Sequence, residues 1–95
     1  MPSIERVYVV EATYAADARE RRAPHRAEHL AGVQRHSAAQ RMLVAGAYDD
    51  MSASLLVLAV ASEDEALALV HADVYWREGV WTEVTVRALN RVVPE

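Results

Sequence analysis

The stretch "LLVLAVA", residues 55–61, decides the fold because every position in it is apolar. It belongs to a strand that we predict over 53–61, "ASLLVLAVA". A strand with no polar side is expected to be covered on both faces. The preceding segment "RMLVAGAY" (41–48) predicts another strand. "DDMS" between the two is a short polar connection, so they are expected to form a hairpin.

Two further strand patterns lie toward the two ends of the sequence. Residues 4–11, "IERVYVVE", are β-branched and aromatic and predict a first strand. Residues 80–93, "VWTEVTVRALNRVV", predict the last strand because apolar or small residues alternate along one side of it. The face defined by this alternation consists of Val80, Thr82, Val84, Val86 and Ala88.

Two helices are expected between these strands. The first lies in a segment rich in Ala, Arg, Glu and Gln, which favour helices. It is predicted from about Pro24 to about Ala39, because proline is accepted only in a first turn. The second, "SEDEALALVHADVYWREG", opens with Ser62 and Glu65 in capping-box spacing and closes near Gly79.

The order β-α-β-β-α-β predicts an α+β fold of the ferredoxin-like type, with a four-stranded antiparallel sheet. The first and third strands lie at the centre of such a sheet. Two helices cover only one of its faces, whereas the strand at 53–61 is apolar on both. A second copy of the same sheet is the economical cover for the other face. We therefore expect a homodimer through sheet faces, which is a dimeric α+β barrel.

Length and charge exclude several classes of protein. Ninety-five residues are expected to form one domain, over 1–95. A net charge of −4 argues against a nucleic-acid partner, which usually meets a basic face. No apolar run approaches the ~18 residues of a membrane span, and the N-terminal segment lacks a signal-peptide layout. A cytoplasmic location and no membrane association are therefore expected.

Two residue types are missing. The sequence contains no cysteine, which excludes disulfides, thiolate nucleophiles and cysteine-based metal sites. It also contains no lysine, so all ten basic residues are arginine. Schiff-base chemistry and a P-loop lysine are excluded in turn. Any catalysis therefore has to use other side chains.

The segment "HRAEH", residues 25–29, has the H-x-x-E-H pattern of one zinc-metalloprotease class. His25 and His29 lie four residues apart, so on a helix both can face one ion. Zinc would still need a third protein ligand, and proteases with this motif are several times longer than this chain. We therefore expect neither a metal nor a cofactor, and the histidines have to act without one.

His29 and Asp73 are the two polar residues predicted on apolar faces. His29 lies at the border of the helical stripe that contains Leu30 and Val33. Asp73 lies three residues beyond Val70, on the apolar side of the second helix. A buried carboxylate is costly unless it finds a donor or lies at a pocket. The plainer alternatives are a structural histidine with satisfied hydrogen bonds and a polar residue at a fraying helix end.

Four further residues are candidates for substrate binding. Tyr75, Trp76 and Trp81 cluster around the junction between the second helix and the last strand, where they would suit a flat, conjugated ligand. Arg26, one turn before His29, would suit an anionic group of a substrate. The alternatives are ordinary packing for the aromatic residues and a solvated side chain for the arginine.

Three short motifs resemble those of the YciI-like (YCII-related) domain family. Its signature is Arg-x-x-His-Leu in a helix, then Ala-Gly-Pro, then Asp-Pro-Tyr. The first is complete here as "RAEHL" (26–30), while "AGA" (45–47) and "DVY" (73–75) lack the prolines. "GVW" (79–81) also matches the family's Gly-Val-aromatic sequence. The resemblance implies a small dimeric α+β barrel with His29 and Asp73 as an active-site pair.

The resemblance and the residue patterns point to one type of chemistry. A histidine bonded to a carboxylate is held in one tautomer and can accept and return a proton near neutral pH. We expect a cofactor-independent lyase or isomerase acting by elimination or tautomerisation on a small, aromatic or anionic substrate. A dehydrochlorinase of a chlorinated hydroxyquinone is a known member of the family. A cofactor-free monooxygenase and a non-catalytic small-molecule-binding or regulatory module stay open as alternatives.

Overall fold

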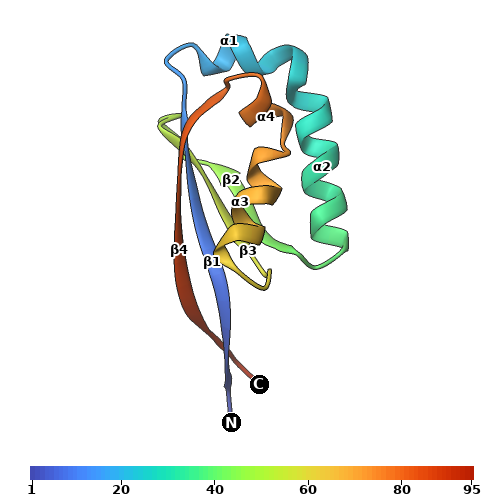
Figure 1. The fold of residues 1–95 in the computed structure, drawn as a ribbon, viewed down its shortest axis with the longest axis vertical. Coiled ribbons are helices and arrows are strands. Elements are labelled where there is room, and N and C mark those ends of the chain that lie inside the picture. The colour runs from blue at the N-terminus through green and yellow to red at the C-terminus, as the bar shows by residue number, and fades with distance from the viewer.

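The computed structural model describes residues 1–95 and shows the predicted α+β fold of the ferredoxin-like type. Its four strands form one antiparallel sheet in the order β2-β3-β1-β4, so the first and third strands are central, as expected. Helices α2 and α3 lie on one side of this sheet (Figure 1). In chain order the elements are β1 (Ser3–Tyr14), α1 (Ala18–Arg22), the 3-10 helix η1 (Ala23–His25), α2 (Arg26–Ala38), β2 (Met42–Ala47), β3 (Ala53–Leu58), α3 (Glu63–His71), α4 (Val74–Arg77) and β4 (Trp81–Val93).

The strands differ in length from the prediction. β1 is longer than 4–11, because it pairs with β4 from Ser3 to Tyr14. β3 ends at Leu58 rather than at 61, because the chain leaves the sheet toward the start of α3. The N-terminal part of β1 and the C-terminal part of β4 extend past the helices as a two-stranded ribbon (Figure 1).

The first predicted helix is bent at its start. α2 ends at Ala38, close to the expected end, but a short α1 precedes it, and Pro24 lies in η1 between the two. Pro24 has no N–H to donate, so the α-helical hydrogen bonds cannot run through it unbroken. The bend lets α1 cross one end of the molecule while α2 runs alongside the sheet (Figure 1).

The second predicted helix is two helices, so the expectation of one continuous helix to Gly79 was wrong. Its beginning is as predicted, because the Ser62 hydroxyl accepts the N–H of Glu65 at 3.1 Å. The break falls at Asp73, whose backbone is extended and whose carboxylate accepts the N–H of Tyr75 at 2.9 Å. An aspartate that caps a new helix offers the backbone an alternative to continuing the old one.

The last strand keeps most of the predicted inward face, including the fully buried Val80, and departs from it near its start. Val84 and Val86 pack on the core as expected, but Thr82 is exposed and Trp81 is buried. The pairing of β1 and β4 shifts register between Thr13 and Tyr14. Such a bulge changes the alternation of side chains. Trp81 therefore turns into the core at this end of the sheet.

The core lies between the helices and the sheet, and the other sheet face is open. That open face carries the half-buried Val9, Leu55 and Val57. Val44 and Leu89 beside them are 51% and 46% exposed. The predicted homodimer would cover this face, and it stays a prediction. No helix is long and apolar enough to span a bilayer.

Candidate active site

His29 and Asp73 come together across the gap between the helices. His29 projects from the first turns of α2, and Asp73 is the residue that caps α4. Nδ1 of His29 lies 3.0 Å from Oδ1 and 2.9 Å from Oδ2 of Asp73. Their side chains are only 11% and 13% exposed, so this pair is largely removed from solvent.

The geometry determines which ring nitrogen is free. An ionised carboxylate only accepts hydrogen bonds, so Nδ1 of the neutral His29 ring carries the proton and donates it to Asp73. Oδ1 of Asp73 is held in turn by the N–H of Tyr75 at 2.9 Å. The backbone N–H of Tyr75 therefore fixes the position of the Asp73 carboxylate. Nε2 is then the ring nitrogen of His29 that has a free lone pair.

Two aromatic rings hold the imidazole in place. The ring of His29 stacks on that of Tyr75 with centroids 3.8 Å apart and an interplanar angle of 8°. Trp81 meets the His29 ring edge-on at 5.4 Å and 89°. The stacked and edge-on contacts with these two buried rings therefore hold the imidazole in one orientation.

His29 lies at the wall of a small hollow of about 140 Å³. The other residues that line this hollow include small and aliphatic side chains of α2, β2 and β3. A second hollow, of about 260 Å³, also borders His29 and is lined by Asp73 but not by Tyr14 or Tyr75. His29 is the residue common to both. The polar residues that line the first hollow are Tyr14, Arg22, Arg26, His29, Ser54 and Tyr75.

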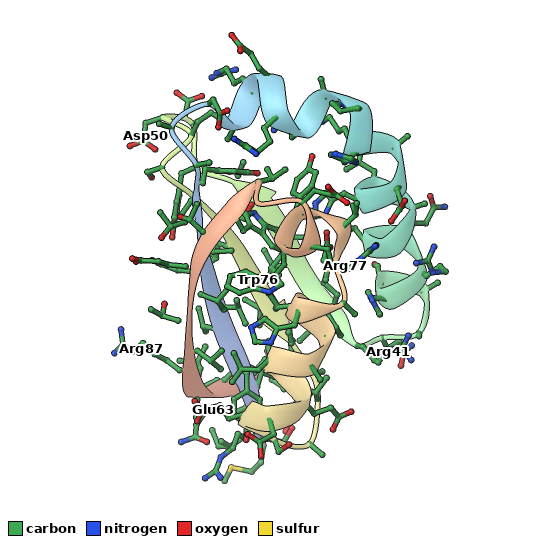
Figure 2. All side chains as sticks on the ribbon, turned by 45° about the horizontal axis from the view of Figure 1, so that its top comes forward. Arg41, Asp50, Glu63, Trp76, Arg77 and Arg87 are labelled. Carbon is green, nitrogen blue, oxygen red and sulfur yellow. The ribbon has the colours of Figure 1, made fainter.

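The lining of the first hollow includes two cationic side chains, Arg22 and Arg26. Neither Arg22 nor Arg26 forms an ion pair, whereas Arg77 binds Glu28 at 2.8 Å. Figure 2 shows Arg77 reaching from α4 toward α2, where this pair lies. The pKa of the Tyr75 phenol is raised from its ordinary value, first by burial and then by Tyr14, while the charges of Arg22 and Arg26 partly oppose the rise.

The other residues predicted for the site fall in two groups. Arg26 and Tyr75 line the first hollow with His29. Trp81 does not line it, but it supports the His29 ring and is almost fully buried. Trp76 lies against His71, with ring centroids 4.7 Å apart, and does not line the hollow (Figure 2). The structure thus brings the histidine–carboxylate pair together with two of the four residues expected to bind substrate.

The remaining histidine of the H-x-x-E-H pattern, His25, is in η1 and half-buried, apart from both hollows. His36 lies on the last turn of α2 beside Arg41, and burial followed by the charges of Arg41 and Arg35 lowers its pKa. No three His, Asp or Glu side chains gather closely enough to hold a metal ion. In addition, Nδ1 of His29 is already hydrogen-bonded to the carboxylate of Asp73.

Sequence reasoning missed three residues of the hollow, Tyr14, Arg22 and Ser54. Ser54 had a signal, because it is the one hydroxyl in the apolar strand at 53–61. It is 3% exposed and bonded on both sides. Tyr14 and Arg22 had none, because they end β1 and α1, and the direction of each element at its end depends on how the elements pack.

The fold and the site together define a class of protein: a small ferredoxin-like α+β domain with a histidine–aspartate pair at a hollow between sheet and helices. The YCII-related domain model matches residues 7–90, and the chain belongs to the YCII-related domain family. This confirms the resemblance inferred from the three sequence motifs. Comparison with curated proteins gives no match.

A solved structure of similar fold is 5-chloro-2-hydroxyhydroquinone dehydrochlorinase from Burkholderia phenoliruptrix AC1100, in complex with 2,5-dihydroxybenzoquinone. It superposes with a TM-score of 0.73 at 22% sequence identity, over 85% of this chain and 90% of the other. At this level of identity the likeness shows a shared fold.

Proposed function

We propose that the protein is a cofactor-independent lyase or isomerase in which His29 is the general base and acid. Asp73 positions its ring and balances its charge. The observation that carries the proposal is the 2.9 Å contact between Nδ1 of His29 and the Asp73 carboxylate at the wall of a polar hollow. This contact leaves Nε2 free to exchange a proton with a bound molecule.

The reaction needs only a proton transfer. Nε2 of His29 takes a proton from an O–H on a conjugated ring, or from a C–H next to a conjugated carbonyl group, and the electron pair of that bond moves into the conjugated system. In an elimination from a hydroxylated ring, the imidazolium returns the proton to the carbon that carries the leaving group. Removal of a second ring O–H proton then sends its electron pair through the ring toward that carbon, and the leaving group departs with its bonding electrons. In an isomerisation, the imidazolium returns the proton to another carbon. Neither route uses an oxidant or a reductant.

The size and charge of the hollow support a substrate with a single ring. A cavity of about 150 Å³ accommodates benzene in another protein, and the hollow beside His29 measures about 140 Å³. Arg22 and Arg26 at its lining are unpaired cations, which favour an anionic or strongly polar ring substituent. The dehydrochlorinase of similar fold was solved with a six-membered dihydroxyquinone, and this supports elimination as the first reaction to test.

The test uses 5-chloro-2-hydroxyhydroquinone as the probe, with chloride release measured under anaerobic conditions that suppress its spontaneous oxidation. H29Q, which lacks the base, is expected to lose about 10²- to 10⁴-fold in turnover. H25Q is the matched control, because His25 is a neighbouring histidine that lines neither hollow. Chloride release by H29Q at the wild-type rate would refute the role of His29.

The two alternative functions give different results with the same probe. A cofactor-free monooxygenase would consume oxygen in step with loss of the probe when the assay is repeated in air, at a rate above that of the spontaneous oxidation measured without protein. A binding module would retain the probe and return it unchanged. Either outcome, with no chloride released, would replace the proposed elimination.

A further inference from the structure

Besides the pair of His29 and Asp73, a series of hydrogen-bonded side chains reaches the hollow from the sheet side. It joins Trp81 of β4, Ser54 of β3 and Tyr14 of β1, three strands that meet at the same end of the sheet. Nε1 of Trp81 donates to Oγ of Ser54 at 3.2 Å, and Oγ of Ser54 donates to the Tyr14 hydroxyl at 2.8 Å. The three residues are 2%, 3% and 8% exposed, so water does not compete for these bonds.

The two hydrogen bonds run in the same direction, from Trp81 through Ser54 to Tyr14. An indole N–H can only donate, so Oγ of Ser54 accepts from Trp81, and in the structure the Ser54 hydroxyl donates its single proton to the Tyr14 oxygen. The oxygen of Tyr14 is thus used as an acceptor, and its own O–H has no acceptor among the protein groups. Because Tyr14 and Ser54 both line the hollow beside His29, that proton is available to a molecule bound there.

A bulge in the pairing of β1 and β4 positions Tyr14 and Trp81 for these hydrogen bonds. The register shift between Thr13 and Tyr14 places Tyr14 opposite Trp81. The same bulge turns the Trp81 ring into the core, where its N–H reaches Ser54. Bulges of this kind are frequently found beside active sites, where they redirect a side chain.

We propose that Tyr14 donates a hydrogen bond to a substrate oxygen that becomes negatively charged when His29 removes the proton. This inference rests on the proposed function and extends it to a substrate class, a single-ring phenol, enol or hydroxyquinone. A donor in place before the reaction stabilises the developing oxyanion without having to reorient. Donation from Ser54 polarises the phenol and makes its O–H a stronger donor. Arg22 and Arg26 supply the positive potential around it.

A binding experiment tests Tyr14 without any turnover. The probe is 4-nitrophenolate, whose absorption differs from that of the neutral phenol, titrated into the whole protein. A hydrogen bond to a charged group contributes about 1.5–3 kcal/mol, so Y14F is expected to bind the phenolate roughly 10- to 100-fold more weakly. S54A, which removes the donor behind Tyr14, is expected to show a smaller loss. Y8F is the control, because Tyr8 is an equally buried tyrosine of β1 that does not line the hollow.

A kinetic experiment with the chlorinated hydroquinone completes the test. Y14F is expected to lower kcat by about 10²- to 10³-fold, because the charge on the oxygen is larger in the transition state than in the bound substrate. KM is expected to change less. Thermal unfolding shows whether each variant is folded, and S54A serves as the second variant if Y14F is not.

The outcomes separate this inference from the proposed function. Weaker phenolate binding by Y14F in a protein that turns nothing over would remove the proposed function and leave the oxyanion donor in place. Turnover that depends on His29, with wild-type binding and kcat in Y14F, would overturn the role of Tyr14 alone. Failure of the wild-type protein to bind 4-nitrophenolate would overturn the substrate class.

Discussion

Replacing Asp73 separates the two tasks of its carboxylate, capping α4 and holding His29. Oδ1 accepts the N–H of Tyr75 at 2.9 Å, and Oδ2 lies 2.9 Å from Nδ1 of His29. In D73N the side-chain oxygen is expected to keep the capping position, because asparagine caps helices as well as aspartate does. The amide nitrogen then takes the position of Oδ2 and donates to Nδ1.

This exchange moves a proton on His29. The neutral ring of D73N is expected to carry its proton on Nε2, whereas the wild-type ring carries it on Nδ1. A protonated Nε2 cannot act as a base, so turnover is expected to fall by about 10²- to 10⁴-fold. Stability changes little, because a bond to a charged acceptor is replaced by a neutral one at a cost of about 1 kcal/mol.

D73A is expected to lose more stability than D73N. It loses the cap, worth about 1 kcal/mol, and leaves the largely buried Nδ1–H of His29 unpaired, which costs about 1–3 kcal/mol. The free energy of unfolding should therefore drop by about 2–4 kcal/mol. For a domain of this size that lowers Tm by roughly 8–30 °C, against roughly 4–8 °C for D73N.

Two measurements decide the question. Nitrogen-15 NMR of the imidazole reports which ring nitrogen carries the proton, and urea unfolding gives the two free energies. A proton that remains on Nδ1 in D73N would refute the assignment of the tautomer. Equal stabilities of D73A and D73N would show that the carboxylate does not cap α4.

Three further predictions concern the rest of the molecule. S62A removes the oxygen that accepts the N–H of Glu65, so thermal unfolding should show a loss of about 1 kcal/mol, or about 4–8 °C in Tm, and S62D should restore it. The pKa of Tyr75 is raised in the folded protein, so its protonated form adds stability that is lost as the pH rises through that pKa. Urea unfolding at about pH 8 and about pH 11 should show a smaller alkaline loss in Y75F than in the wild type. L89E places a charge on the open sheet face, so sedimentation should find the dimer predicted for the wild type replaced by monomers, while A31E, at an exposed position of α2, should keep that dimer.

The order and type of the main elements followed from local patterns in the sequence. Alternation and apolar runs gave the four strands, and Ser62 with Glu65 gave the start of α3. The same reasoning placed His29 and Asp73 on inward-facing sides of their segments. Periodicity suffices here because it reports the direction of a side chain relative to the axis of its own element.

Tertiary structure decided which inward-facing side chains meet. The break at Asp73 arises because its carboxylate is held by both Tyr75 and His29, and the second of these contacts joins residues 44 positions apart. The chain from Trp81 through Ser54 to Tyr14 depends on a bulge between β1 and β4. A bulge is set by the pairing of distant strands, which leaves no pattern within either segment. The sequence by itself therefore determined the fold and two polar residues that face inward, and the packing of sheet against helices made a site of them.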